Sequence, residues 1–127
     1  MVGSFALAFH GHPRYTGDID FWVKNDEQNA IKVYKTIMDF GFPSGELNVE
    51  DFISKDLIFQ MGYPPVRIDI LTTIEALEFE NCYLKREVKN IDNMMIPFLN
   101  IEDLKKNKKA VGRKKDLADF EALSKNT

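Results

Sequence analysis

Residues 18–23 alternate between two kinds of side chain at every position. One face of this segment carries Asp18, Asp20 and Trp22, and the other carries apolar side chains only. A period of two is typical of a β-strand with one buried face. Two neighbouring carboxylates repel each other, and burying either without a compensating charge is costly. The pattern therefore predicts a strand whose acidic face binds a cation, and Mg²⁺ prefers such oxygen ligands.

A second strand pattern carries a third acid. Val66–Leu71 is aliphatic apart from Arg67 and Asp69, although aspartate is unfavourable in such a strand. Another expected strand, residues 57–61, precedes it, and the prolines of 62–65 confine the joint to a turn. Three acids on neighbouring strands would form a two-metal site for phosphoryl chemistry. The alternative is structural: an Asp-x-Asp pair is common at strand ends, and Asp69 could be a strand-edge residue paired with Arg67 or with a lysine.

A Gly-Ser pair stands ahead of an apolar run, residues 5–10, that we expect to form a buried helix. Backbone N–H groups at the start of a helix attract phosphate. Gly3 would let the backbone approach a phosphate closely, and the Ser4 hydroxyl could donate to it. The same dipeptide is also common as a simple turn or helix cap.

The remaining patterns alternate helices with strands. In chain order we expect a helix capped by Asn25 or Asp26 and ended by Gly41, a short helix opened at 48–51, a helix within 73–84, strands at 87–88 and 94–97 paired around 92–93, a helix over 101–110 capped by Asn100, and a helix over 115–124. The 127 residues are thus predicted to form one α/β or α+β domain, residues 1–127, with a small mixed β-sheet flanked by helices.

Charge is distributed unevenly along the chain. The helical C-terminal segment 101–127 carries 8 basic and 5 acidic residues, whereas the whole chain has a net charge of -3. A cationic surface there could meet nucleotide phosphates or an RNA backbone, with Lys109, Arg113 and Lys115 as the preferred candidates. The alternative is a solvated helix face. Arg14, in the loop before the acidic strand, could bind triphosphate oxygens or form a surface ion pair.

Several further residues carry simpler expectations. Asp116 and Asp119 are expected to cap and solvate the last helix, and Trp22 either to pack in the core or to stack on a nucleotide base. The single cysteine, Cys82, cannot form an internal disulfide and is expected to be a buried small hydrophobe. No apolar run approaches the roughly 20 residues of a membrane helix, and no signal-peptide pattern is present. We therefore expect a cytoplasmic location and no membrane partner.

Together these motifs resemble a known superfamily. Gly3-Ser4, then 13 residues, then Asp18-Ile-Asp20 resembles the signature of the DNA polymerase β-like nucleotidyltransferases, and Ile68-Asp69-Ile70 matches their third acid. Residues 9–23, 60–71 and 107–119 look more closely like the small stand-alone bacterial nucleotidyltransferases related to the AbiEii toxin family. The resemblance covers nearly the whole chain and implies a nucleotidyltransferase fold.

The resemblance also implies roles. Gly3 and Ser4 would hold the nucleotide phosphates, Asp18 and Asp20 would bind one or two Mg²⁺ ions, and Asp69 would bind a metal ion and help to deprotonate the acceptor. For Asp116 and Asp119 the resemblance implies an alternative to capping, a structural salt bridge near the site. The implied reaction moves a nucleoside monophosphate from a nucleoside triphosphate (NTP) to a hydroxyl of tRNA, other RNA or a protein, within a toxin–antitoxin or phage-defence system. The alternative is a catalytically degenerate module that binds nucleotide or a partner protein.

One departure from the resemblance concerns the first residues. Relatives carry a helix and a full first strand ahead of the Gly-Ser motif, where this chain has Met1-Val2. We therefore expect either a truncated start or the loss of that element. A sheet edge exposed in this way could pair with a second copy and give a homodimer.

Overall fold

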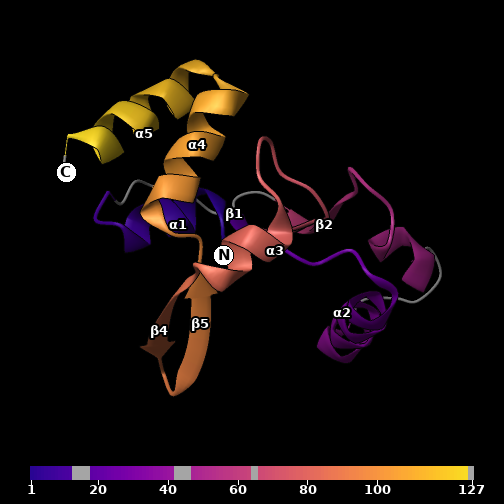
Figure 1. Cartoon of the computed structure of the whole chain (residues 1–127). Coiled ribbons are helices and arrows are strands. Elements are labelled where there is room, and N and C mark those ends of the chain that lie inside the picture. Colours follow the sequence, from indigo (N-terminus) through magenta and orange to yellow (C-terminus); the bar gives the residue numbers. More distant parts are fainter. Residues whose placement is uncertain (13–17, 42–46, 64–65, 126–127) are drawn as a thin grey trace.

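The computed structural model describes residues 1–12, 18–41, 47–63 and 66–125 (Figure 1). Arg14 and the prolines at 64–65 lie outside the described residues, so the expectations placed on them stay untested. The Ser4 backbone is described as the second residue of a helix, and its side chain is not described.

A three-stranded sheet forms the centre of the fold. The strand β1 (Asp18–Trp22) pairs in parallel with β3 (Val66–Leu71), and β2 (Ile58–Tyr63) pairs with the other edge of β3 in antiparallel orientation. The strand order β1-β3-β2 makes the sheet mixed, as the sequence predicts. Because β3 is the middle strand, the interpretation of Asp69 as a strand-edge residue is wrong.

Helices cover the sheet on two sides, and each side has its own apolar cluster. The first cluster joins α1 (Gly3–Phe9), α3 (Phe79–Leu84), α4 (Ile101–Val111) and α5 (Lys114–Ser124) through residues that include Leu7, Cys82, Leu104 and Leu123. The second joins α2 (Glu27–Phe40) and the 3-10 helix η2 (Val49–Phe52) to the sheet through Ile37, Phe52 and Ile70. Figure 1 shows α4 and α5 together at one end of the molecule, away from α2. The expected α+β class is confirmed.

Local signals in the sequence account for the ends of these elements. Asp26 caps α2, since its side chain accepts a hydrogen bond from the Asn29 backbone N–H at 2.8 Å, and Gly41 ends that helix with φ of 106°. The hairpin of β4 (Glu87–Ile91) and β5 (Met94–Phe98) turns at two residues of positive φ, Asp92 and Asn93. The expected elements are confirmed, with ends that differ by a few residues.

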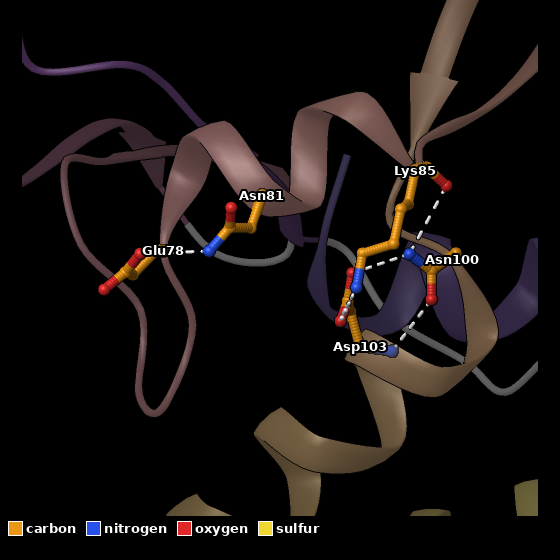
Figure 2. Close-up of polar contacts among 5 residues, drawn as sticks. All are labelled: Glu78, Asn81, Lys85, Asn100 and Asp103. Carbon is orange, nitrogen blue, oxygen red and sulfur yellow. Dashed lines mark hydrogen bonds and ion pairs between the residues drawn. The ribbon is translucent and has the colours of Figure 1, made fainter.

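The start of α4 is fixed by a polar cluster that Figure 2 shows. The Asn100 side chain accepts from the Asp103 backbone N–H at 2.9 Å, and its Nδ2 donates to the Asp103 carboxylate at 2.6 Å. Lys85, at the end of α3, adds an ion pair to Asp103 at 3.4 Å, and its carbonyl accepts from Asn100. The predicted cap at Asn100 is confirmed, and it ties the first turn of α4 to α3.

Asn100→Ala is expected to lower the free energy of unfolding by about 1 to 2 kcal/mol, because it removes the cap and leaves part of the Asp103 carboxylate without its donor. Urea denaturation at neutral pH measures this. Asn81→Ala is the matched control: Asn81 is exposed and donates only to Glu78 in the same region (Figure 2), so its loss should cost less than about 0.5 kcal/mol. Equal losses in the two variants would contradict the assignment of the cap.

Cys82 is 3% exposed within the first apolar cluster, which confirms the expected small buried hydrophobe. Burial, with a smaller contribution from a hydrogen bond to Asp103, raises the pKa of its thiol to about 11.

Among the described residues, the helices are all too short or too polar to cross a membrane.

Candidate active site

Three carboxylates meet where β1 and β3 run side by side. Asp20 is the register partner of Asp69, and Asp18 is the register partner of Arg67. Parallel strands in register place paired residues on the same face of the sheet, so all four side chains share one face. The structure therefore brings together the three acids that the sequence singled out, although 49 residues separate Asp20 from Asp69 along the chain.

Among the described residues, Arg67 is a cation that contacts these acids. Its Nε and Nη2 donate to the two oxygens of Asp69 at 2.8 and 3.1 Å, and Nη2 also lies 3.3 Å from Asp18. The two-pronged contact to Asp69 is the strong geometry for a guanidinium and a carboxylate. The pairing of Asp69 with Arg67 that the structural alternative anticipated is thus present, on the central strand.

The carboxyl group of Asp20 has a perturbed pKa. Its pKa is raised to about 6, first because the carboxyl is partly buried, and then because Asp69 and Asp18 repel its charge and Asp69 is its hydrogen-bond partner. Arg67 lowers the pKa only as the smallest contribution. The guanidinium of Arg67 contacts Asp69 and Asp18, and its charge only partly offsets the effects that raise the pKa of Asp20.

The acids fit a hard divalent cation in their chemistry, since all the donors are carboxylate oxygens and their mutual repulsion is only partly relieved. In the geometry described for residues 1–12, 18–41, 47–63 and 66–125, no three His, Cys, Asp or Glu side chains are grouped closely enough to hold a metal ion. Arg67 lies among these acids, where its guanidinium forms ion pairs with oxygens of both Asp69 and Asp18.

The raised pKa of Asp20 gives a prediction for the protein without metal. Because the folded-state value of about 6 exceeds the ordinary 3.8, the folded protein holds the proton longer than the unfolded chain. The free energy of unfolding must then fall as pH rises from about 4 to about 6. Asp20→Asn removes this loss. At pH 8 in EDTA, the free energy of unfolding of the variant should therefore exceed that of the wild type by about 1 kcal/mol, which corresponds to a few degrees in Tm. This size allows for the partial exposure of the Asp20 side chain. This difference in stability should vanish near pH 4. If the free energies of unfolding of the two proteins ran parallel over this pH range, the raised pKa of Asp20 would be contradicted.

Gly3 approaches Asp20 so closely that no side chain fits between them. Its φ is +66°, and a Cβ atom built on Gly3 would lie 2.1 Å from Asp20 Oδ2. The sequence predicted a close approach at this glycine, with phosphate as the neighbour. The neighbour that the structure shows is the carboxylate of Asp20, and phosphate binding by Gly3 and Ser4 stays a prediction.

Gly3→Ala is expected to destabilise the protein by more than about 1 kcal/mol, because alanine is strained at positive φ and its methyl group collides with Asp20. Thermal denaturation measures the effect. Gly11 offers a matched control, since its φ is +93° but a Cβ there meets no atom within 4 Å. Gly11→Ala introduces the backbone strain without a collision. If Gly3→Ala lowered the thermal stability no more than Gly11→Ala does, the proposed collision with Asp20 would be contradicted.

A cavity of about 220 Å³ opens beside the acids and is closed from the other side by α4 and α5. Gly3, Asp18 and Asp20 line one wall, and Lys108, Arg113, Lys115 and Asp116 line the opposite one. Residues from both ends of the chain therefore meet at one site. Two of the three predicted tail cations, Arg113 and Lys115, belong to it.

The opposite wall contains a buried charge cluster. Lys108, on α4, lies 3.1 Å from Asp119 and 3.5 Å from Asp116, both on α5, and Arg113 Nε donates to Asp116 at 2.6 Å. Asp116 and Asp119 are 1% and 7% exposed. The expectation that they are solvated is wrong: both are buried, face α4 and form a structural ion pair with its lysine beside the site. Asp116 does lie in the first turn of α5, the position expected of a capping acid. Burial alone would raise the pKa of Asp116, but Arg113 and Lys108 outweigh it and hold that pKa below its usual value.

Other predicted residues lie elsewhere. Lys109 does not line the cavity, and its Nζ lies 5.6 Å from the centre of the Phe120 ring. Trp22 shares a strand face with the acids but packs edge-on against Phe79, and its Nε1 donates to the Thr72 carbonyl at 3.3 Å. Packing is therefore the role that the structure shows for Trp22.

Lys108 is the site residue that the sequence reasoning missed. A signal was available: Ile101, Leu104 and Lys108 recur at helical spacing, which places this lysine on the core-facing stripe of its helix. Asp116 and Asp119 recur with Leu123 in the same way on α5. Opposite charges that interrupt the apolar stripes of two adjacent helices indicate a buried pair between them.

A scan against protein-family models finds no match for this chain, and a search of curated proteins finds no significant match either.

Proposed function

We propose that the protein is a Mg²⁺-dependent nucleotidyltransferase that moves a nucleoside monophosphate from an NTP to a hydroxyl of RNA, such as tRNA, or of a protein. The observation that carries the proposal is the cavity lined by Asp18 and Asp20 on β1 and by Lys115, Arg113 and Lys108 from the C-terminal helical segment, where Asp116 pairs with the last two. Acids on one wall suit a metal ion, and cations on the other suit a polyphosphate. The resemblance to nucleotidyltransferases of the AbiEii type supports the same reading, and it alone suggests a toxin–antitoxin or phage-defence setting.

In this reaction the acceptor oxygen forms a bond to the α-phosphorus, the bond from that phosphorus to the leaving oxygen breaks, and pyrophosphate departs. Bound Mg²⁺ would neutralise charge on the phosphates. Asp18, Asp20 and Asp69 would hold the ion, and Asp69 would help to accept the proton of the attacking hydroxyl. Arg113 and Lys115 would hold the triphosphate, so that catalysis consists mainly of positioning and charge neutralisation.

The contacts of Arg67 favour a second candidate. With its guanidinium on Asp69 and Asp18, the acid cluster already has a counter-ion inside the fold. A protein of this kind could bind nucleotide through the cations of α4 and α5 without turnover. The second candidate is therefore a catalytically degenerate module that binds nucleotide or a partner protein.

One assay separates the candidates. The purified protein is incubated with each of the four NTPs, labelled at the α-phosphate, together with Mg²⁺ and either total RNA or total protein from cells. We expect label to enter one acceptor pool from at least one NTP, and EDTA to prevent it. Micromolar NTP binding without any transfer would favour the binding module, and transfer that EDTA leaves unchanged would contradict the metal-dependent mechanism.

A further inference from the structure

The cavity beside the acids is too small for a whole NTP. Its volume is about 220 Å³, whereas pockets that enclose a drug-sized ligand span roughly 300 to 1,000 Å³. A triphosphate and its metal ion would fill it. If the proposed function holds, the nucleoside must therefore extend beyond this cavity, and a neighbouring cavity could receive it.

A second cavity of about 510 Å³ adjoins the first. The two share a wall formed by Leu71, Asn107, Val111 and Arg113, which line both. By contrast, the cavity of about 590 Å³ beside Trp22 and Phe79 shares no lining residue with the first, despite its aromatic side chains. Continuity therefore points to the cavity behind Arg113, between the end of β3 and α4.

The lining of this second cavity suits an uncharged ring system. Leu71, Ile74 and Val111 provide apolar surface for a base. The Asn107 side chain is held in place, since its Nδ2 donates to the Glu75 carbonyl at 3.1 Å. A fixed amide beside an apolar surface can discriminate among bases by hydrogen bonding.

The rim of the cavity is acidic. Asp56 and Glu75 both line it, and the Asp56 carboxylate is oriented by a hydrogen bond of 2.7 Å from the Thr73 hydroxyl. These charges would repel the phosphates of a nucleic-acid acceptor, and they would accept hydrogen bonds from ribose hydroxyls or from the amino group of a base. The rim therefore favours the nucleoside over an RNA backbone.

We propose that this second cavity binds the nucleoside of the NTP, with Arg113 at the boundary between the nucleoside and the triphosphate. The inference rests on the proposed function, because it assumes that the first cavity binds the triphosphate. It also deepens that function, because it assigns recognition of the base to residues of β2, β3, the segment 73–76 and α4.

Two ligands and two variants test the proposal. Isothermal titration in Mg²⁺ compares each NTP with inorganic triphosphate, which has no nucleoside. Ile58→Trp places an indole in the second cavity at a position that is 60% exposed in the wild type, so the fold should tolerate it. Ile53→Trp is the matched control, since Ile53 is also exposed, at 38%, and lies outside the lining of both cavities.

We expect the preferred NTP to bind the wild type at least about tenfold more tightly than inorganic triphosphate does. Ile58→Trp should weaken NTP binding by about tenfold or more and change triphosphate binding by less than about twofold, while Ile53→Trp should change neither. Equal affinity of the wild type for the two ligands, or an equal loss of both in Ile58→Trp, would overturn the nucleoside site and leave the proposed function standing. A wild type that binds neither ligand would contradict the proposed function itself and the inference with it.

Discussion

Asp18→Asn and Asp20→Asn are each expected to lower nucleotidyl transfer by at least about 1,000-fold, equivalent to about 4 kcal/mol of transition-state stabilisation. Asparagine keeps the shape of the side chain but removes the negative charge that would hold Mg²⁺ beside the triphosphate. Single-turnover labelling at saturating NTP and Mg²⁺ measures the chemical step and separates it from weaker binding. The two positions should behave alike, because they lie on one face of β1 and line one cavity.

Asp39→Asn is the matched control for these variants. Asp39 is exposed near the end of α2 and does not line the cavity, so the same chemical change should leave transfer within about twofold of the wild type. Thermal denaturation of all three variants shows whether each is folded. Transfer at the wild-type rate in a folded Asp18 or Asp20 variant would contradict the assignment of these acids to a catalytic metal site.

Lys108→Met is expected to lower the free energy of unfolding by about 3 to 5 kcal/mol. The lysine side chain is 7% exposed and pairs with two carboxylates that are themselves buried. Removing it leaves Asp119 without this cation, and Arg113 as the remaining ion-pair partner of Asp116. Methionine has a similar length and suits an apolar site, so the expected loss comes mainly from the two buried carboxylates that lose this cation and little from a cavity.

Lys109→Met provides the comparison, because Lys109 is the next residue of α4 and is exposed. Its replacement should cost no more than about 0.5 kcal/mol. A further variant that combines Lys108→Met with Asp116→Leu and Asp119→Leu should recover most of the lost stability, since apolar residues can replace a buried ion cluster at little cost. Urea denaturation at pH 7 measures all of these proteins, and equal losses for Lys108→Met and Lys109→Met would contradict the buried cluster.

Much of the fold could be predicted from local patterns. The alternation in residues 18–23 predicted β1, and the caps at Asp26, Gly41 and Asn100 predicted where α2 and α4 begin or end. Each of these signals acts over a few residues, through side-chain period or through hydrogen bonds to the nearest backbone groups. For that reason distant contacts in the folded chain change the structures that these signals predict only a little.

The composition of the candidate site depended mostly on pairings between elements that lie far apart in the chain, and only the helical spacing of Lys108, Asp116 and Asp119 gave a local signal for one of them. The contact of Arg67 with Asp18 requires β1 and β3 to be parallel neighbours in one particular register. Likewise, the burial of Asp116 and Asp119 requires α5 to pack against the face of α4 that carries Lys108. The sequence of α5 taken by itself predicted that these acids are solvated, because charged side chains near the start of a helix usually lie in water.

The register of β1 against β3 also bears on how the chain reaches its folded state. Strands β2 and β3 follow each other closely in the chain and can pair with little loss of chain entropy, whereas β1 must close a loop that includes α2 and β2. Arg67 and Asp69 lie on the same strand, so the buried acid of β3 can acquire its counter-ion before β1 arrives. Asp18 and Asp20 then join a partly neutralised sheet face. Arg67, which would compete with the proposed metal ion in the folded protein, would in this way lower the electrostatic barrier to assembling the site.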